Sequence, residues 1–172
     1  MATNNIQEFR DTFLKQGMQR ASQFNVQMQG PGMSLFEFQP ESVTVPGREL
    51  QIYRDELWGP ERSIPVKRTF NSAIITTFAM DREWKAKDYI EEWMDKLVTP
   101  YADGNMRQSY TDTIKNCTLN IEAMNNDGTT ANATIVVVEP WPQTIMPLDM
   151  GHAMFNDYVR MQVSWAYRRY DY

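Results

Sequence analysis

Residues 159–168 read VRMQVSWAYR, a stretch in which large apolar side chains alternate with polar or small ones. Its apolar members are Val159, Met161, Val163, Trp165 and Tyr167, and between them stand Arg160, Gln162, Ser164 and Arg168. Because successive side chains of a strand point to opposite faces, the pattern predicts a strand that is buried on one face and wet on the other. We expect a long terminal strand that begins near residue 156.

The same alternation occurs near the other end of the chain, in residues 23–29, QFNVQMQ. Phe24, Val26 and Met28 alternate there with amide side chains, which predicts a strand over residues 21–29. Gly30-Pro31-Gly32 would close it, and residues 35–39, LFEFQ, would be its hairpin partner. One-sided strands of this kind favour antiparallel sheets with a polar face.

Length and charge narrow the class of protein. The 172 residues, 42% of them hydrophobic, suit one core, so we expect one domain. A net charge of −5 argues against tight binding of nucleic acid, which needs clustered Lys and Arg. No apolar run is long enough to span a bilayer, no signal peptide pattern is present, and Cys117 is the only cysteine. These features predict assembly in a reducing cytoplasm.

Four further segments have patterns that predict their structure. Residues 82–98 predict a helix after an N-cap at Asp81, and residues 4–19 predict a short N-terminal helix or arm. Residues 73–80 predict a strand, whereas the proline-containing residues 43–68 predict an extended excursion with short strands and little core. The apolar stripe expected on the longer helix comprises Ala86, Tyr89, Ile90, Trp93, Met94 and Leu97.

Residues 117–124 and 131–139 predict a hairpin. A three-residue loop, Asn126-Asp127-Gly128, would pair Ala123 with Ala131 and would keep apolar and polar residues on separate faces. The polar face would carry Thr118, Asn120, Glu122, Asn132 and Thr134. We expect loops over residues 102–112 and after Pro140-Trp141-Pro142.

The sequence predicts no catalytic, cofactor-binding or metal site. His152 is the only histidine and lies in an expected loop, and Cys117 opens a strand without a basic neighbour, as a buried structural thiol would. There is no phosphate-binding glycine motif, and the pair Glu91-Glu92 fits a solvated helix face. Lys67-Arg68 and Arg168-Arg169 suit salt bridges between acidic subunits. Met and aromatic residues in loops, including Trp58, Trp141 and Met146, indicate either interfaces or caps on the core.

The order of several landmarks resembles one known family. VPGREL at residues 45–50 is followed by IPVKRTF at 64–70, by MDRE at 80–83 before the helix with Trp93, and by EPWPQTIMPLD at 139–149. This order is similar to that of the tail tube protein of contractile-tailed phages of the T4 type, over about residues 20–172. The chain departs from the family at Met150-Gly151-His152 and in its N-terminal arm.

The resemblance implies a mainly β fold in which two roughly orthogonal antiparallel sheets form a β-barrel or sandwich, flanked by the helix at 82–98. Residues 1–19 would be the N-terminal helix or arm and residues 20–172 the tail-tube domain. It further implies a non-enzymatic virion protein without cofactors, forming stacked hexameric rings through which double-stranded DNA passes. Its partners would be other copies of itself, the tail sheath protein, the baseplate and tail-terminator proteins and the tape measure protein.

Two sets of residues are candidates for this role. The polar side chains of the predicted hairpin, Asn120, Glu122, Asn132 and Thr134, are expected to face the lumen, where a neutral or acidic surface would not retain DNA. The excursion at 45–68 is expected to contact the neighbouring ring, because it is stiffened by proline and carries both charges. Its candidate residues are Arg48, Arg54, Asp55, Glu56, Trp58, Glu61 and Arg62.

Three alternatives remain open from the sequence. A baseplate protein that initiates the tube would share the fold and form a single ring. The tube protein of a bacterial contractile injection or secretion system would share the fold and carry effectors. A small ligand-binding β-barrel, a protein of a different class, would need converging polar groups in an apolar pocket.

Overall fold

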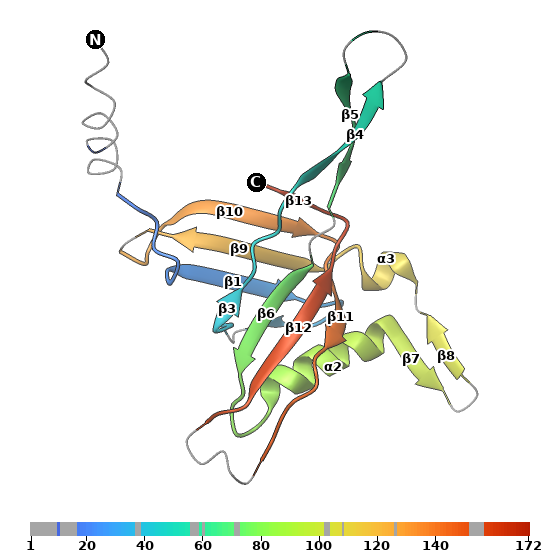
Figure 1. Ribbon diagram of the computed structural model, residues 1–172. Helices are drawn as coiled ribbons and strands as arrows, with labels where there is room; N and C mark the ends of the chain where they lie inside the picture. The colour runs from blue at the N-terminus through green and yellow to red at the C-terminus, as the bar shows by residue number, and fades with distance from the viewer. Residues whose placement is uncertain are drawn as a thin grey trace.

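The computed structural model is mainly β, as the sequence predicts, and describes residues 10, 17–36, 39–55, 59, 61–70, 73–101, 104–107, 109–125, 127–151 and 157–172. Two antiparallel sheets lie face to face with strands running in different directions (Figure 1). The five-stranded sheet has the order β13-β10-β9-β1-β2, and the four-stranded sheet has the order β11-β12-β6-β3. The two sheets form a sandwich that does not close into a barrel.

The strands of the five-stranded sheet are β1 (Phe24–Gln29), β2 (Leu35–Phe36), β9 (Thr118–Met124), β10 (Ala131–Val138) and β13 (Arg169–Asp171). Those of the four-stranded sheet are β3 (Ser42–Val43), β6 (Ile74–Ala79), β11 (Trp141–Ile145) and β12 (Arg160–Ala166). Two separate hairpins project from the body, β4 (Glu49–Asp55) with β5 (Arg62–Thr69) and β7 (Val98–Tyr101) with β8 (Gly104–Arg107). The helices are α2 (Lys85–Leu97) and α3 (Tyr110–Thr113).

The core lies between the sheets and beneath α2. The apolar faces predicted from alternation are the buried ones, since Val26 and Met28 of β1 and Met161, Val163 and Trp165 of β12 are fully buried. The helix α2 buries Ala86, Ile90, Trp93 and Leu97 in this core, and all four belong to the apolar stripe predicted for the helix. The Trp93 and Trp165 rings meet edge to face with centroids 5.1 Å apart. The prediction of one amphipathic helix packed on a sheet is confirmed.

The helix begins three residues later than the sequence predicts. Trp84 has a left-handed backbone with φ of 57°, and the Trp84 N–H donates to the Asp81 carbonyl at 3.3 Å, so residues 81–84 form a turn. The Asp81 carboxylate still accepts a hydrogen bond from the Lys85 N–H at 3.0 Å. Asp81 therefore satisfies an orphan donor of the first turn without being the N-cap residue.

The predicted register of the β9–β10 hairpin is wrong by two residues. Ala123 pairs with Ala133, and Ile121 pairs with Ile135, with a bulge between Ala131 and Ala133. The connection is longer than three residues because the Asn125 N–H donates to the Thr130 carbonyl at 2.7 Å, which closes a wider loop. Gly128 is left-handed as expected, with φ of 70°. A shift by two preserves the facing of every side chain, so the polar face is the predicted one.

Three other sequence predictions fail. The terminal strand begins at Arg160 and breaks at residues 167–168, where the chain leaves the four-stranded sheet and enters the other sheet as β13. The loop expected after Pro140-Trp141-Pro142 begins later, because residues 143–145 still belong to β11, and the one proline of β11, Pro142, is tolerated because β11 is an edge strand. The expected loop at 102–112 contains β8 and most of α3, for which the sequence offers no strong hydrophobic period.

Several predictions fall on residues outside the described ones. These include most of the N-terminal helix expected at 4–19, of which only Arg10, which is helical, and residues 17–19, which are not, are described, and part of the strand expected at 35–39. Glu56, Trp58 and His152 also lie outside the described residues. The division into residues 1–19 and 20–172 remains a prediction.

Candidate assembly surfaces

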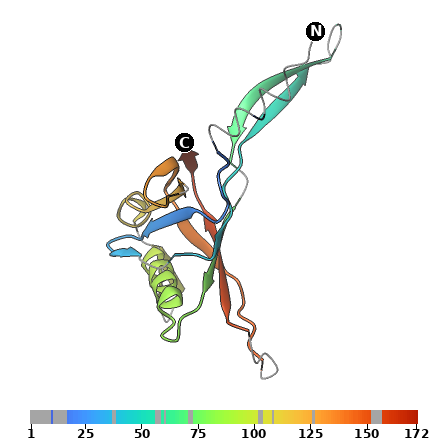
Figure 2. The same cartoon turned by 90° about the vertical axis from the view of Figure 1, so that its left-hand side faces the viewer.

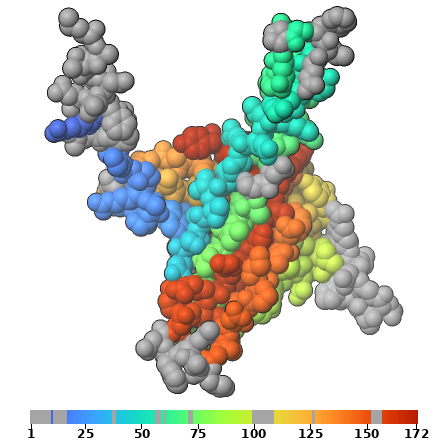
Figure 3. Space-filling model, in the orientation of Figure 1, coloured from blue at the N-terminus to red at the C-terminus, as the bar shows by residue number. Residues whose placement is uncertain are grey.

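The β4–β5 hairpin, here called the arm, stands away from the body of the molecule (Figures 2 and 3). Its strands pair only with each other, from Glu49 opposite Thr69 to Asp55 opposite Arg62. The register shifts between Gln51 and Ile52, where Val66 forms a bulge opposite them. Pro65 can lie in β5 because each arm strand has one free edge. The extended excursion predicted from the sequence is confirmed, with strands longer than expected.

Apolar side chains of the arm are exposed to solvent. Leu50, Ile52, Tyr53, Ile64 and Val66 are between 47% and 67% exposed. An isolated two-stranded hairpin is marginally stable in water, and an exposed group of large apolar side chains marks a site of interaction. No described residue of the arm belongs to the buried core of its own copy.

The charged arm residues predicted from the sequence lie at different positions between the base and the tip of the hairpin. Arg54 near the tip forms an exposed ion pair with Glu61 at 3.4 Å, and Asp55 lies beside Arg62 in the ladder. Arg48 lies at the base, with its guanidinium 4.6 Å from the Tyr170 ring centroid. The cation–π contact anchors the arm to β13.

The outer face of the five-stranded sheet is polar, and the structure brings three of the four candidate lumen residues together there. Glu122 pairs with Thr134 across β9 and β10, and Asn120 precedes it on the same face. The Asn25 amide of β1 donates to the Glu122 carboxylate at 2.8 Å. Asn132 lies in the bulge instead, and its amide donates to the Gln19 side chain at 3.1 Å.

The opposite end of the molecule from the arm carries a polar cluster that the sequence analysis did not single out. Glu41 accepts hydrogen bonds from the Tyr158 hydroxyl at 2.8 Å and from Arg160 at 3.0 Å. These bonds, the one from Tyr158 first, lower the pKa of Glu41 below its ordinary value of 4.5. Arg160 also stacks 4.0 Å from the Tyr158 ring centroid and forms an ion pair with Asp157 at 3.5 Å.

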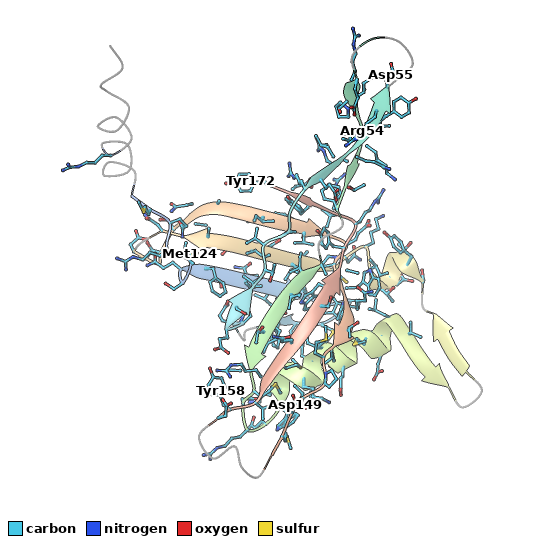
Figure 4. The ribbon with its side chains drawn as sticks, viewed as in Figure 1. Arg54, Asp55, Met124, Asp149, Tyr158 and Tyr172 are labelled. Atoms are coloured by element: carbon cyan, nitrogen blue, oxygen red, sulfur yellow. The ribbon has the colours of Figure 1, made fainter. Side chains whose placement is uncertain are left out.

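Asp157, Tyr158 and Arg160 of this cluster form one wall of a groove of about 500 Å³, here called the lower groove, whereas Glu41 is not part of its lining. Its other walls include Met146, Asp149 and Met150, of which the two methionines are exposed apolar residues. Figure 4 shows Asp149 and Tyr158 at the end of the molecule that lies farthest from Arg54 and Asp55. Glu41 and Arg160 are 119 residues apart in sequence, so no local pattern could have joined them.

A second opening, here called the inter-sheet groove, lies where the sandwich fails to close. It measures about 840 Å³ and is lined by the partly buried inner-face residues Phe24, Val43, Ala133 and Ile135. Gln19, Glu41 and Tyr172 lie on its lining as well. The groove is an open continuation of the core.

Cys117 is buried, as the sequence predicts for a structural thiol. Burial raises its pKa to about 12, and its Sγ donates to the Thr113 carbonyl at 2.8 Å. A thiol with so high a pKa is almost wholly protonated at neutral pH and is a poor nucleophile. Within the described part of the chain, no group of three or more His, Cys, Asp and Glu side chains could hold a metal ion. None of the described helices has the length and apolar character needed to cross a membrane.

Comparison with known proteins adds a family and a fold. The model of a family described as phage tail tube protein matches residues 7–172. Nothing among the curated proteins matches the chain. Similar solved structures include a chain from the anti-feeding prophage (AFP) baseplate, with a TM-score of 0.66 and 9% identity over 88% of this chain and 93% of that one.

Two more solved structures share the fold. A chain of the PVC sheath–tube complex, from an extracellular contractile injection system in its extended state, has a TM-score of 0.61 and 15% identity over 94% of this chain and 95% of that one. A chain of the AFP tube-terminating cap has a TM-score of 0.60 and 17% identity, covering 91% of each chain. The similarity at these identities is one of fold.

Proposed function

The chain belongs to the phage tail tube protein family, and from that premise we propose that its copies form hexameric rings that stack into the inner tube of a contractile tail. The tube would be the conduit through which double-stranded DNA leaves the virion. This role is structural and requires no catalytic residue, cofactor or metal ion. Assembly would take place in the cytoplasm of the host, and the mature protein would be a virion component.

The exposed apolar arm is the observation that supports stacking most strongly. Transferring one Val, Leu or Ile side chain from water into a contact contributes roughly 1.5–3 kcal/mol. Leu50, Ile52, Ile64 and Val66 gain only part of this in a single copy, because each is about half exposed or more. A neighbouring ring would bury them. The candidates Arg48, Arg54, Asp55, Glu56, Trp58, Glu61 and Arg62 lie in the same segment.

Free strand edges support the joining of copies into a ring. β11 is one edge of the four-stranded sheet. The edge of β10 that faces away from β9 has no described partner strand along residues 131–135, because β13 pairs only with Val136, Val137 and Val138. Unpaired edges expose backbone donors and acceptors to other chains. Pairing them between subunits would satisfy these groups and would generate a closed cyclic assembly, the usual outcome of a heterologous contact whose rotation closes.

The lumen would be lined by a polar sheet face. We propose the face of β9 and β10 that carries Asn120, Glu122 and Thr134, with Asn132 at its end. The surface carries a carboxylate and neutral groups, and it lacks the lysine and arginine clusters that hold phosphates. DNA would therefore slide past it. The tail sheath, baseplate, tail-terminator and tape measure proteins are the partners that such a tube requires.

Negative-stain electron microscopy of the purified protein tests this function. We expect hexameric rings and hollow tubes of stacked rings. A variant lacking residues 50–62 should remain folded, with an ordinary circular dichroism spectrum and a compact elution volume in size-exclusion chromatography. It should form no tubes. Tubes of normal length from the deletion variant would refute the stacking role of the arm. Single rings of the full-length protein that never extend would instead indicate a tube initiator.

A further inference from the structure

The arm and the lower groove lie at opposite poles of the molecule. In both cartoon views the arm projects at one end, and the connection between β11 and β12 lies at the other (Figures 1 and 2). Figure 4 places Arg54 and Asp55 at the first pole and Asp149 and Tyr158 at the second. The body of the sandwich separates the two.

A stack of identical rings imposes a geometric condition on these poles. If every ring has the same orientation, the surface at one pole of a copy faces the surface at the opposite pole of a copy in the next ring. Such a contact is heterologous and extends without closing, as a tube requires. An arm that points along the stacking axis must therefore meet the end of the molecule that carries the lower groove.

The two surfaces have matching apolar parts. The arm exposes Ile52, Ile64 and Val66, and the groove exposes Met146 and Met150 on its walls. Methionine side chains are flexible and fill irregular gaps against other apolar groups, which suits a surface that receives a hairpin. Neither set is buried within its own copy.

The two surfaces also have matching charges. On the arm, Arg62, Lys67 and Arg68 form no ion pair with any described residue. In the lower groove, Asp149 is exposed and likewise has no ion-pair partner among the described residues. The hairpin as a whole is balanced, with four basic and four acidic side chains over residues 49–69, so the match is one between individual charges. An ion pair between one of these arm cations and Asp149 would fix the orientation of the contact.

We propose that the arm of each copy binds the lower groove of a copy in the next ring. The proposal rests on the proposed function and assigns the receiving surface for the arm. The occupant of the groove is thus a second copy of this chain, and the contact residues include Ile64 and Arg62 on the arm and Met146, Met150 and Asp149 in the groove.

Cysteine cross-linking of assembled protein tests the proposal. The native Cys117 is buried with a pKa of about 12, so it will not compete for a maleimide. Ser63→Cys places a thiol on the exposed arm, and Asp149→Cys places one in the groove. Treatment of the assembled double variant with a short bismaleimide should give a denaturation-resistant ladder that continues beyond six copies, with at least tenfold more cross-linked chain than either single variant.

A matched pair controls for the position of the receiving surface. Ser63→Cys combined with Gln19→Cys directs the same arm thiol to the inter-sheet groove, a different opening whose lining is also partly apolar. This pair should give no ladder. A ladder from it, or a ladder that stops at six copies in the Asp149→Cys variant, would overturn the proposal, because the arm would then bind another surface or a neighbour in its own ring.

Loss of a charge at position 149 could itself weaken assembly, so a second pair is needed. Ser63→Cys with Gln162→Cys uses an exposed neutral residue that lines the same groove and should give the same ladder. Tubes without a ladder from either pair would overturn the assignment of the groove and leave the tube function intact. Failure of the unmodified protein to form tubes would instead refute the proposed function.

Discussion

The core beneath α2 and the arm are stabilised by different partners. Trp93, Trp165 and Phe78 are almost fully buried by residues of their own copy, and their rings meet one another or neighbouring aromatic rings edge to face. The apolar residues of the arm are about half exposed and touch no core. Both regions are rich in large apolar side chains, so composition alone does not distinguish them. The difference is whether the partner lies in the same chain.

Folding of the single copy and assembly of many copies therefore depend on different regions of this molecule. A change in the core should lower the free energy of unfolding of a single copy, and assembly should fail only as a result. A change in the arm should leave that free energy almost unchanged and should act on assembly directly. The following variants test the separation in order of their expected effect on the single copy.

Trp93→Ala should have the largest effect. It removes a fully buried indole that contacts Trp165, and truncation of a buried aromatic residue destabilises a domain by about 3–5 kcal/mol. Urea unfolding followed by far-ultraviolet circular dichroism measures the change. A loss below about 1 kcal/mol would show that α2 does not hold the two sheets together.

Gly30→Ala should destabilise the single copy by about 1–3 kcal/mol, the usual cost of overpacking. A Cβ at position 30 would lie 2.8 Å from the Met33 Sδ and 2.9 Å from Cδ2 of the Trp93 ring. The Met33 side chain can move, but the Trp93 ring is fixed by the core. Thermal unfolding gives the change, and an unchanged midpoint would mean that the β1–β2 turn is not packed tightly on α2.

Trp165→Phe should cost about 1–3 kcal/mol, because it leaves the buried Thr76 hydroxyl without the indole donor that lies 2.8 Å away. Adding Thr76→Val to the same variant removes the hydroxyl that has lost its donor, and it should recover part of the lost free energy of unfolding. A double-mutant cycle by urea unfolding isolates this coupling. Additive effects of the two substitutions would show that the hydrogen bond contributes nothing.

The triple variant Ile52→Ser, Ile64→Ser and Val66→Ser should change the free energy of unfolding by less than about 0.5 kcal/mol, since all three side chains are exposed. It should nevertheless lose tube formation. Chemical unfolding of the unassembled copy and electron microscopy measure the two properties side by side. A large loss of stability would place the arm in the folding unit and would remove the distinction between the two regions.

Glu41→Gln should have the smallest effect and a defined pH dependence. The hydrogen bonds from Tyr158 and Arg160 lower the pKa of Glu41, so its contribution is present above 4.5 and is lost as pH falls through the lowered pKa. The difference in thermal midpoint between wild type and Glu41→Gln should be constant from neutral pH down to about pH 5 and shrink below 4.5. A difference that grows in acid would contradict this sign.

Much of the fold could be predicted because the informative patterns are local. The alternation in β1 and β12 predicted which face of each sheet is buried, and the apolar stripe around Trp93 predicted the helix α2. The polar face of β9 and β10 was also predicted correctly, because side-chain facing depends only on the parity of the pairing. The arm could be identified as an excursion from its prolines and its lack of a core pattern.

The remaining features depend on contacts between distant residues. The β9–β10 register was set by a wide loop closed between Asn125 and Thr130, which a short-turn argument could not anticipate. The break after Ala166 reflects a change of sheet and not a change of hydrophobic pattern. Beside the lower groove, Glu41 binds Arg160 from 119 residues away, a separation that single-sequence patterns do not connect.

Hydrogen exchange of the arm amides, compared between the unassembled copy and the tube, tests the central claim most directly. The account predicts that amides of Glu49–Asp55 and Arg62–Thr69 exchange rapidly in the single copy and become protected by at least about 100-fold on assembly. Amides of Lys85–Leu97 should be protected in both states. Arm amides already protected in the single copy, or unprotected in the tube, would contradict the claim that the arm is stabilised by a neighbouring copy.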